Sequence, residues 1–222
     1  MNRSKCAQCG LVNPATDETC RRCHAKLNRD GMIEEAPPVE RVEKRGFGKR
    51  VLWVLGTTSA LLFVCYMSLL LTSDELGFDR RQTVERAIAV LEEKNFSSQA
   101  FVLRHLVKYR RTDNWWNRYV GHHDAYAATN FPFEVVTVYP EFFDAAVDDT
   151  ERAAILLHES YHLFGSAEAA ALEGVWREKR RLGWTEDKYG QTKVWNNNKE
   201  LTTGSVPVLF QCGADGHSDC VP

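Results

Sequence analysis

The motif His158-Glu159-Ser160-Tyr161-His162 has the residue types and spacing of a site for metal-assisted hydrolysis. Two histidines four residues apart lie on one face of a helix, so both imidazoles can bind the same ion. Glu159, next to the first histidine, is placed to take a proton from the water that the ion activates. We therefore predict that His158 and His162 are metal ligands and that Glu159 is the general base.

The flanking sequence predicts the helix that this motif requires. Asp148 and Glu151 have the N-cap and N3 spacing of a capping box, and Gly165 is placed to end the helix. We expect a second helix over residues 166–182, directly after Gly165.

That second helix offers two candidates for a third metal ligand, Glu168 and Glu173. On a helical wheel Glu168 falls on the apolar stripe of Leu172, Val175 and Leu182, whereas Glu173 falls among arginines. A carboxylate on a buried stripe is costly unless it is paired or metal-bound. We therefore prefer Glu168 and expect it to be buried.

These residues resemble the zincin metallopeptidases, and the resemblance covers about residues 134–182. The spacing His158-x3-His162-x2-Gly165-x2-Glu168 follows the metzincin pattern HExxHxxGxxH, with a glutamate in place of the third histidine. A glutamate ligand is typical of gluzincins, the thermolysin-like enzymes. No methionine follows Met67, so the metzincin Met-turn has no counterpart here. The resemblance implies an α+β zincin-like domain, mostly helical with a small sheet, and one catalytic Zn2+.

A second set of metal-ligand residues lies near the N-terminus. Cys6, Cys9, Cys20 and Cys23 form a CxxC-x10-CxxC pattern, in which two tight turns direct four thiolates at one zinc ion. The surrounding residues resemble the small zinc ribbons at the N-termini of many bacterial proteins, with His24 where those modules usually have glycine. We expect a structural Zn2+ here, with His24 as an alternative ligand. The acidic linker favours a protein partner, or none, over nucleic acid, and the partner itself stays open.

Between these sites, residues 51–71 carry no charged side chain. A helix of about 20 apolar residues is long enough to cross the hydrocarbon core of a bilayer. Five basic residues precede this segment and three acidic ones follow it: Arg41, Lys44, Arg45, Lys49 and Arg50, then Asp74, Glu75 and Asp79. The positive-inside rule then predicts a single-pass protein of a bacterial inner or plasma membrane, with a cytoplasmic N-terminus.

Composition and charge agree with this division of the chain. The net charge of -2 excludes a globally basic nucleic-acid binder, and 44% hydrophobic residues exclude a disordered chain. Residues 1–50 carry 11 Lys and Arg against 7 Asp and Glu, whereas the rest of the chain is acidic. We predict a zinc ribbon over residues 1–30, a linker over 31–50, a transmembrane helix over 51–71, and a periplasmic or extracellular metallopeptidase domain over 72–222.

The last two cysteines, Cys212 and Cys220, lie in this outer domain, where thiols can oxidise to a disulfide. Two unpaired thiols, or a small metal site that includes His217, are the alternatives.

Periodicity predicts several further elements of the outer domain. Residues 79–95 and 97–109 have helical patterns, with Phe101, Val102, Leu106 and Val107 as the apolar residues of the second helix. Residues 115–132 have no clear period and are expected to be a loop. Residues 134–139 read as a strand, which could hold an extended peptide by edge pairing.

A membrane-tethered zinc endopeptidase acting on a peptide or protein substrate is the function that these residues favour. Donors for its oxyanion could come from Tyr139, Tyr161, His122, His123 or His217. A sensor or scaffold that binds metal without catalysis is the alternative, and a non-peptidase hydrolase using the same metal is a third possibility. The intact Glu159 favours an enzyme, because a binding module has no need of a carboxylate between its two histidines.

Overall fold

The computed structural model describes residues 3–27, 47–121, 125–213 and 218–221. The chain divides into two compact units, Met1–Val51 and Leu52–Pro222. The described residues have mixed α/β structure, with many helices and two small sheets. The elements of the described residues are β1 Arg3–Lys5, β2 Val12–Pro14, α1 Phe47–Leu71, α2 Phe78–Glu93, α3 Ser97–His105, β3 Lys108–Arg110, α4 Trp115–Val120, β4 Ala127–Asn130, β5 Val135–Val138, α5 Pro140–Asp144, α6 Asp149–Leu163, α7 Glu168–Leu182, α8 Glu186–Tyr189, α9 Lys193–Ser205 and the 3-10 helix η1 Pro207–Phe210.

The N-terminal unit contains a short antiparallel pair, β1–β2, in which Arg3 lies opposite Pro14 and Lys5 opposite Val12. Between residues 3 and 27 the buried side chains are only Cys6, Asn13 and Cys20. So small a core cannot hold a chain of this length folded, which is the situation in which a bound metal supplies the folding free energy.

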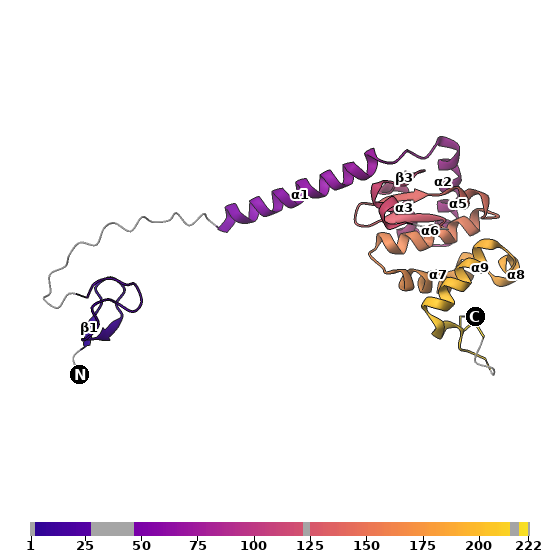
Figure 1. Ribbon diagram of the computed structural model, residues 1–222. Helices are drawn as coiled ribbons and strands as arrows, with labels where there is room; N and C mark the ends of the chain where they lie inside the picture. Colours follow the sequence, from indigo (N-terminus) through magenta and orange to yellow (C-terminus); the bar gives the residue numbers. More distant parts are fainter. Residues whose placement is uncertain (1–2, 28–46, 122–124, 214–217, 222) are drawn as a thin grey trace. The chain divides into compact units, whose positions relative to one another are not determined.

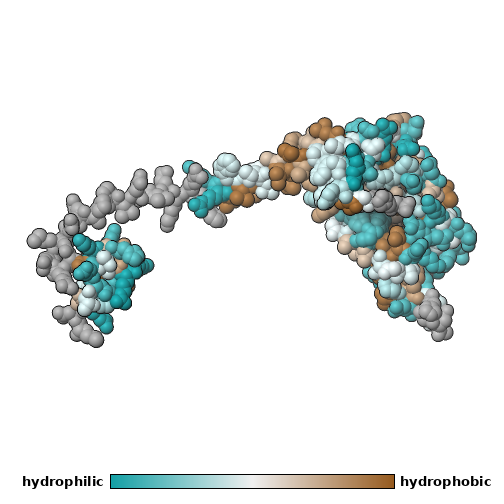
Figure 2. All heavy atoms as spheres, viewed as in Figure 1, coloured by the Kyte–Doolittle hydropathy of each residue, from teal (hydrophilic) through white to brown (hydrophobic). Residues whose placement is uncertain are grey.

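Helix α1 contains the apolar segment. Within the described residues, the stretch Gly48–Leu71 is long and apolar enough to cross a membrane, with a mean hydropathy of 2.0 and only 6% of the window buried. Figure 2 shows hydrophobic residues along much of this helix. A core helix of a soluble protein with this composition would be mostly buried, which this helix is not.

The second unit is built around a three-stranded sheet with the strand order β3-β5-β4. β5 pairs in parallel with β3 and antiparallel with β4, and all four of its residues are buried. The strand predicted over residues 134–139 is therefore confirmed, but it is the central strand. Because β5 is paired on both sides, the edge that we expected it to offer to a peptide does not exist; β4 occupies an outer position instead.

Helix α6, which carries the HExxH motif, lies between this sheet and α7 (Figure 1). It also packs against α2, whose buried stripe is Val84, Ala87, Ile88 and Leu91, as the periodicity predicts. α7 approaches α6 closely at Gly174, where a Cβ would lie only 2.6 Å from the ring of Tyr161. α6 is thus held on several sides, and its side chains are positioned by the core.

Two predictions for the region before α6 are wrong. The helix expected over 97–109 ends at His105, and residues 108–110 form β3, because pairing with β5 satisfies their backbone groups. Its buried side chains are Ala100 and Leu103, while Phe101 and Leu106 are exposed. The loop expected over 115–132 contains α4 and β4, whose short runs are too brief to show a period.

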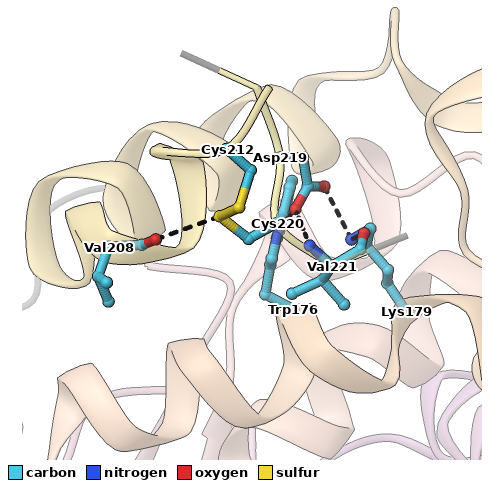
Figure 3. Close-up of a disulfide and its surroundings, with 7 residues drawn as sticks. All are labelled: Trp176, Lys179, Val208, Cys212, Asp219, Cys220 and Val221. Carbon is cyan, nitrogen blue, oxygen red and sulfur yellow. Dashed lines mark hydrogen bonds and ion pairs between the residues drawn. A yellow bond between two sulfur atoms is a disulfide. The ribbon is translucent and has the colours of Figure 1, made fainter. Parts of the chain in front are cut away.

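A polar cluster fastens the C-terminal segment to α7, and a disulfide links two positions within that segment (Figure 3). Asp219 accepts a hydrogen bond from Trp176 Nε1 at 3.1 Å and pairs with Lys179 at 2.8 Å. Cys212 and Cys220 form a disulfide across eight positions of sequence. This confirms the predicted disulfide and excludes the alternative of two free thiols. His217, the residue of the alternative metal site, lies outside the described residues.

Candidate metal centres

The HExxH helix begins as the sequence predicts. Asp148 is the N-cap, and its side chain accepts hydrogen bonds at 3.0 Å from the backbone N–H groups of Thr150 and Glu151. The Glu151 carboxylate accepts from the backbone N–H of Val147, one residue before the usual partner in a capping box. These bonds satisfy N–H groups that a helix start leaves without intrahelical partners.

Three predicted ligands of the second unit converge on one point. His158 Nε2 and His162 Nε2 lie 3.1 Å apart, and the Glu168 carboxylate lies 3.4 Å from the first and 3.1 Å from the second. Ligands about 2.0 Å from a tetrahedral zinc are separated by about 3.3 Å, so this set has the size and chemistry of a zinc site. It leaves a fourth position for a water or substrate atom, as catalytic zinc sites do.

The turn after α6 brings the third ligand to the two histidines. Gly165 has φ +82, a left-handed conformation in which a side chain is strained, and its N–H donates to His162 O at 2.9 Å. The chain then reverses, and α7 begins at Glu168 itself. The turn at Gly165 therefore brings Glu168 to the two histidines.

The reason we gave for choosing Glu168 is wrong, although the residue does reach the histidines. Leu172, Val175 and Leu182 are buried as predicted, but the Glu168 side chain is 60% exposed. Glu168 lies in the first turn of α7, and the core covers the apolar stripe only from later residues of that helix. Glu173 instead forms an ion pair with Arg177 at 2.7 Å.

Hydrogen bonding fixes which nitrogen of His162 faces the ion. Nδ1 lies 2.9 Å from the carbonyl oxygen of Ser166, which can only accept, so in the neutral ring Nδ1 carries the proton and Nε2 has the lone pair that could bind a metal. The hydrogen bond to Glu168 is the main reason why the pKa of His162 is raised from 6.5 to about 8 without metal. Hydrogen bonds from His158 and His162 in turn hold the pKa of the Glu168 carboxyl well below its usual range.

This raised pKa predicts a pH dependence of zinc binding. Below about pH 8 the metal-free His162 holds a proton that zinc must displace, so affinity should fall by up to about tenfold per pH unit as the pH is lowered. Competition with a fluorescent chelator at several pH values measures this slope. NMR of the metal-free imidazole gives its pKa, which should move from about 8 toward 6.5 in Glu168→Gln. A pKa unchanged by that substitution would contradict the proposed cause.

Glu159 is positioned beside the ligands by a neighbour from the sheet. Its side chain is 4% exposed, and its Oε2 accepts a hydrogen bond of 2.7 Å from Thr129 Oγ1 in β4. Among the described residues its Oε1 has no hydrogen-bond partner, although it borders the cleft described next. One carboxylate oxygen is thus held in place and the other is available to a water or substrate.

The three converging side chains and Glu159 line a cleft of about 460 Å3. One wall is β4, through Ala127, Ala128 and Thr129, and the opposite side includes residues of α9. In the part of the chain that the structure describes, β4 pairs only with β5, so its other edge is unpaired. The cleft thus combines candidate ligands, a carboxylate and a free strand edge.

Of the expected oxyanion donors, the two that the structure describes, Tyr139 and Tyr161, do not lie at this cleft. The Tyr139 hydroxyl donates to Asp113, Tyr161 packs on Gly174, and neither borders the cleft. His122, His123 and His217 lie outside the described residues. Asn197 and Asn198 of α9 do border it and carry amide donors. A run of asparagines inside a helix is the signal that could have identified them, because asparagine is disfavoured there.

The four N-terminal cysteines also come together. Their sulfur atoms all lie within 4.8 Å of one another, with Cys6–Cys23 and Cys9–Cys20 both at 3.5 Å, close to the separation of about 3.8 Å in a tetrahedral zinc–thiolate site. This cluster is close enough for a zinc ribbon. Burial raises the pKa of the Cys20 thiol, but hydrogen bonds from the backbone, Cys9 and Asn13 outweigh it and bring the pKa to about 6. A thiol with that pKa is ready to bind a cation.

His24 is not part of the cysteine cluster. It is exposed and adopts φ 60 at the position equivalent to Gly10, which has φ 75 in the first turn. The two turns have matching bonds, since Gly10 N–H donates to Cys6 O and His24 N–H donates to Cys20 O, both at 2.9 Å. The described ligand set is therefore four sulfurs.

Comparison of the chain with protein-family models, curated proteins and solved structures finds no match. The function is therefore inferred from the site itself.

Proposed function

We propose that this protein is a membrane-tethered zinc metallopeptidase with a zincin-like catalytic domain. The observation that carries the proposal is the convergence of His158, His162 and Glu168 in a cleft that also contains the buried Glu159. A site that only stores or senses metal needs neither a carboxylate beside its ligands nor a substrate-sized cleft.

Each residue of the site has a separate role in the proposed reaction. Zinc held by His158, His162 and Glu168 would lower the pKa of a water molecule and polarise the substrate carbonyl. Glu159, oriented by Thr129, accepts the proton of the attacking water and passes it to the leaving amine. Asn197 and Asn198 of α9, which border the cleft, would donate hydrogen bonds to the oxyanion.

The unpaired edge of β4 supplies a way to bind an extended peptide. A substrate added as a strand beside Ala127–Asn130 would form backbone hydrogen bonds whatever its sequence. Its alternate side chains would point into the cleft and away from it. This arrangement favours an endopeptidase that acts on extended segments of a peptide or protein.

We further propose a single-pass topology in a bacterial inner or plasma membrane, with the ribbon in the cytoplasm and the catalytic domain outside. The basic residues before α1 and the acidic residues after it support this orientation. The pairing of Cys212 with Cys220 supports an oxidising surrounding for the outer domain, whereas a cysteine-bound zinc suits a reducing one.

Zinc analysis and peptide-library digestion of the full-length protein in nanodiscs test the proposal. We expect two zinc ions per chain, and cleavage that a chelator stops and added zinc restores. Two ions without cleavage would favour the alternative of a metal-binding sensor or scaffold. If the protein binds a single zinc ion and a His158 variant still binds it, the proposed catalytic site has no basis.

Two glutamate variants test which carboxylate completes the site. Glu168→Gln should weaken the outer zinc site by at least about 100-fold, since it removes a charged ligand. Glu173→Gln is the matched control on the same helix, and it should leave the affinity unchanged because Glu173 pairs with Arg177. Equilibrium zinc titration of both proteins gives the result, and equal affinities would exclude Glu168 as the third ligand.

A further inference from the structure

The short helix α4 has the reverse of the usual distribution of polar and apolar residues. Its outward face carries Trp115, Trp116, Tyr119 and Val120, which are 44%, 46%, 81% and 50% exposed. The side chain that it buries is polar, because Asn117 is 0% exposed. A surface helix in water turns its apolar side chains inward, so this arrangement indicates that water does not surround the outward face of α4.

A chain of amide hydrogen bonds fixes this orientation. Asn114 Nδ2 donates to Asn130 Oδ1 at 2.7 Å, and Asn130 Nδ2 donates to Asn117 Oδ1 at 2.7 Å. Asn117 Nδ2 then donates to Thr137 Oγ1 of the central strand at 3.0 Å. Rotating α4 to bury its aromatic residues would break these buried bonds, so the aromatic face is held outward.

α4 is attached to the last turn of the candidate membrane-spanning helix. Trp115 donates from Nε1 to Ser68 Oγ at 2.9 Å and from its backbone N–H to Thr72 Oγ1 at 3.2 Å. Arg118 donates to Thr72 O at 2.7 Å. The aromatic face therefore lies at the level where α1 ends, and Figure 2 shows hydrophobic residues along α1 up to the domain that follows it.

Two further contacts make this junction rigid. Arg110, which is 7% exposed, donates to the carbonyl oxygens of Leu70 and Ser73 and so satisfies acceptors at the C-terminus of α1. The rings of Tyr66 and Phe133 lie 6.5 Å apart, which joins α1 to the turn between β4 and β5. The domain is thus fastened to α1 from two elements besides α4.

We propose that α4 rests in the interfacial layer of the bilayer that α1 crosses, with Trp115, Trp116, Tyr119 and Val120 among the lipid headgroups and upper acyl chains. Trp and Tyr are enriched at this depth because their rings are apolar and their N–H and O–H groups are polar. The exposed Arg118 on the same helix can pair with lipid phosphate. The proposal rests on α1 spanning a membrane, and it is independent of catalytic activity.

Tryptophan fluorescence in nanodiscs tests this position in the full-length protein. With Trp53→Phe, the remaining tryptophans are Trp115 and Trp116 on α4 and three fully buried ones, Trp176, Trp184 and Trp195. Lipids brominated near the headgroup should quench the emission more strongly than lipids brominated near the chain ends. This extra quenching should disappear when Trp115→Phe and Trp116→Phe are added.

Equal emission in brominated and unbrominated nanodiscs would overturn the proposal, since the face would then be in water. If the lipids do not quench the emission and the reconstituted protein self-associates, the proposal is also overturned. A second copy of the chain would then cover the aromatic face of α4. Trp116→Phe alone is a second variant, because among the described residues the Trp116 side chain makes ring contacts but no hydrogen bond that would be lost with its indole. It should keep the fold and lose part of the quenching.

Discussion

Glu159→Gln is expected to lower peptide hydrolysis by at least about 1,000-fold while both zinc ions stay bound. Glutamine has nearly the same shape as glutamate and can still accept the hydrogen bond from Thr129 Oγ1. It cannot accept a proton, however, so the attacking water loses its base. Because Glu159 is absent from the set of converging ligand atoms, zinc content should not change.

The measurement is cleavage of a peptide library by wild-type and variant protein, with metal analysis of the same samples. Thr129→Val is the graded control, because it removes the bond that positions Glu159 but leaves the carboxylate. We expect a decrease of about tenfold for Thr129→Val, largely restored in Thr129→Ser. Unchanged cleavage by Glu159→Gln would show that Glu159 is not the base.

Cys20→Ser is expected to unfold the N-terminal ribbon and release its zinc. Cys20 is 0% exposed, and the buried side chains between residues 3 and 27 are otherwise Cys6 and Asn13. Zinc binding contributes about 10–16 kcal/mol to folding in comparable small modules, far more than two three-residue strands can supply. The zinc and the fold of the second unit should persist, since that unit has its own core.

Cobalt substitution distinguishes the two sites, because only the ribbon gives thiolate-to-metal absorption. His24→Gly is the matched control within the same turn. It should keep the full absorption and bind slightly more tightly, by about 1 kcal/mol, since glycine adopts a positive φ without strain. A ribbon that stays folded in Cys20→Ser, or loss of metal in His24→Gly, would contradict the four-sulfur site.

The sequence predicted best the features that depend on residues close together in the chain. The HExxH spacing places two imidazoles together on any helix, and Asp148 and Gly165 mark where this helix starts and stops. Each CxxC pair likewise brings its two thiols together within one turn. The apolar run of α1 can be recognised from its length and composition alone, without knowing which segments it contacts.

Predictions failed where long-range pairing decides the structure. The predicted helix over 97–109 includes residues 108 and 109, but these belong to β3, because β5 lies beside them. β5 reads as a strand from its own residues, but whether a strand is central or at an edge depends on its neighbours. The exposure of Glu168 was misjudged because a helical wheel does not show where the core ends along the helix.

By itself the sequence determined the His158–His162 pair, the two CxxC pairs and the apolar helix, since each is encoded by spacing within one turn or one helix, but it left Glu168 and Glu173 both open as the third ligand. Only the tertiary structure decided that Thr129 holds Glu159, that β4 offers the free edge, and that α4 turns its aromatic residues outward. The physical reason is that these features are contacts between segments distant in the chain, and local pattern fixes which face a segment can bury but not what it meets there.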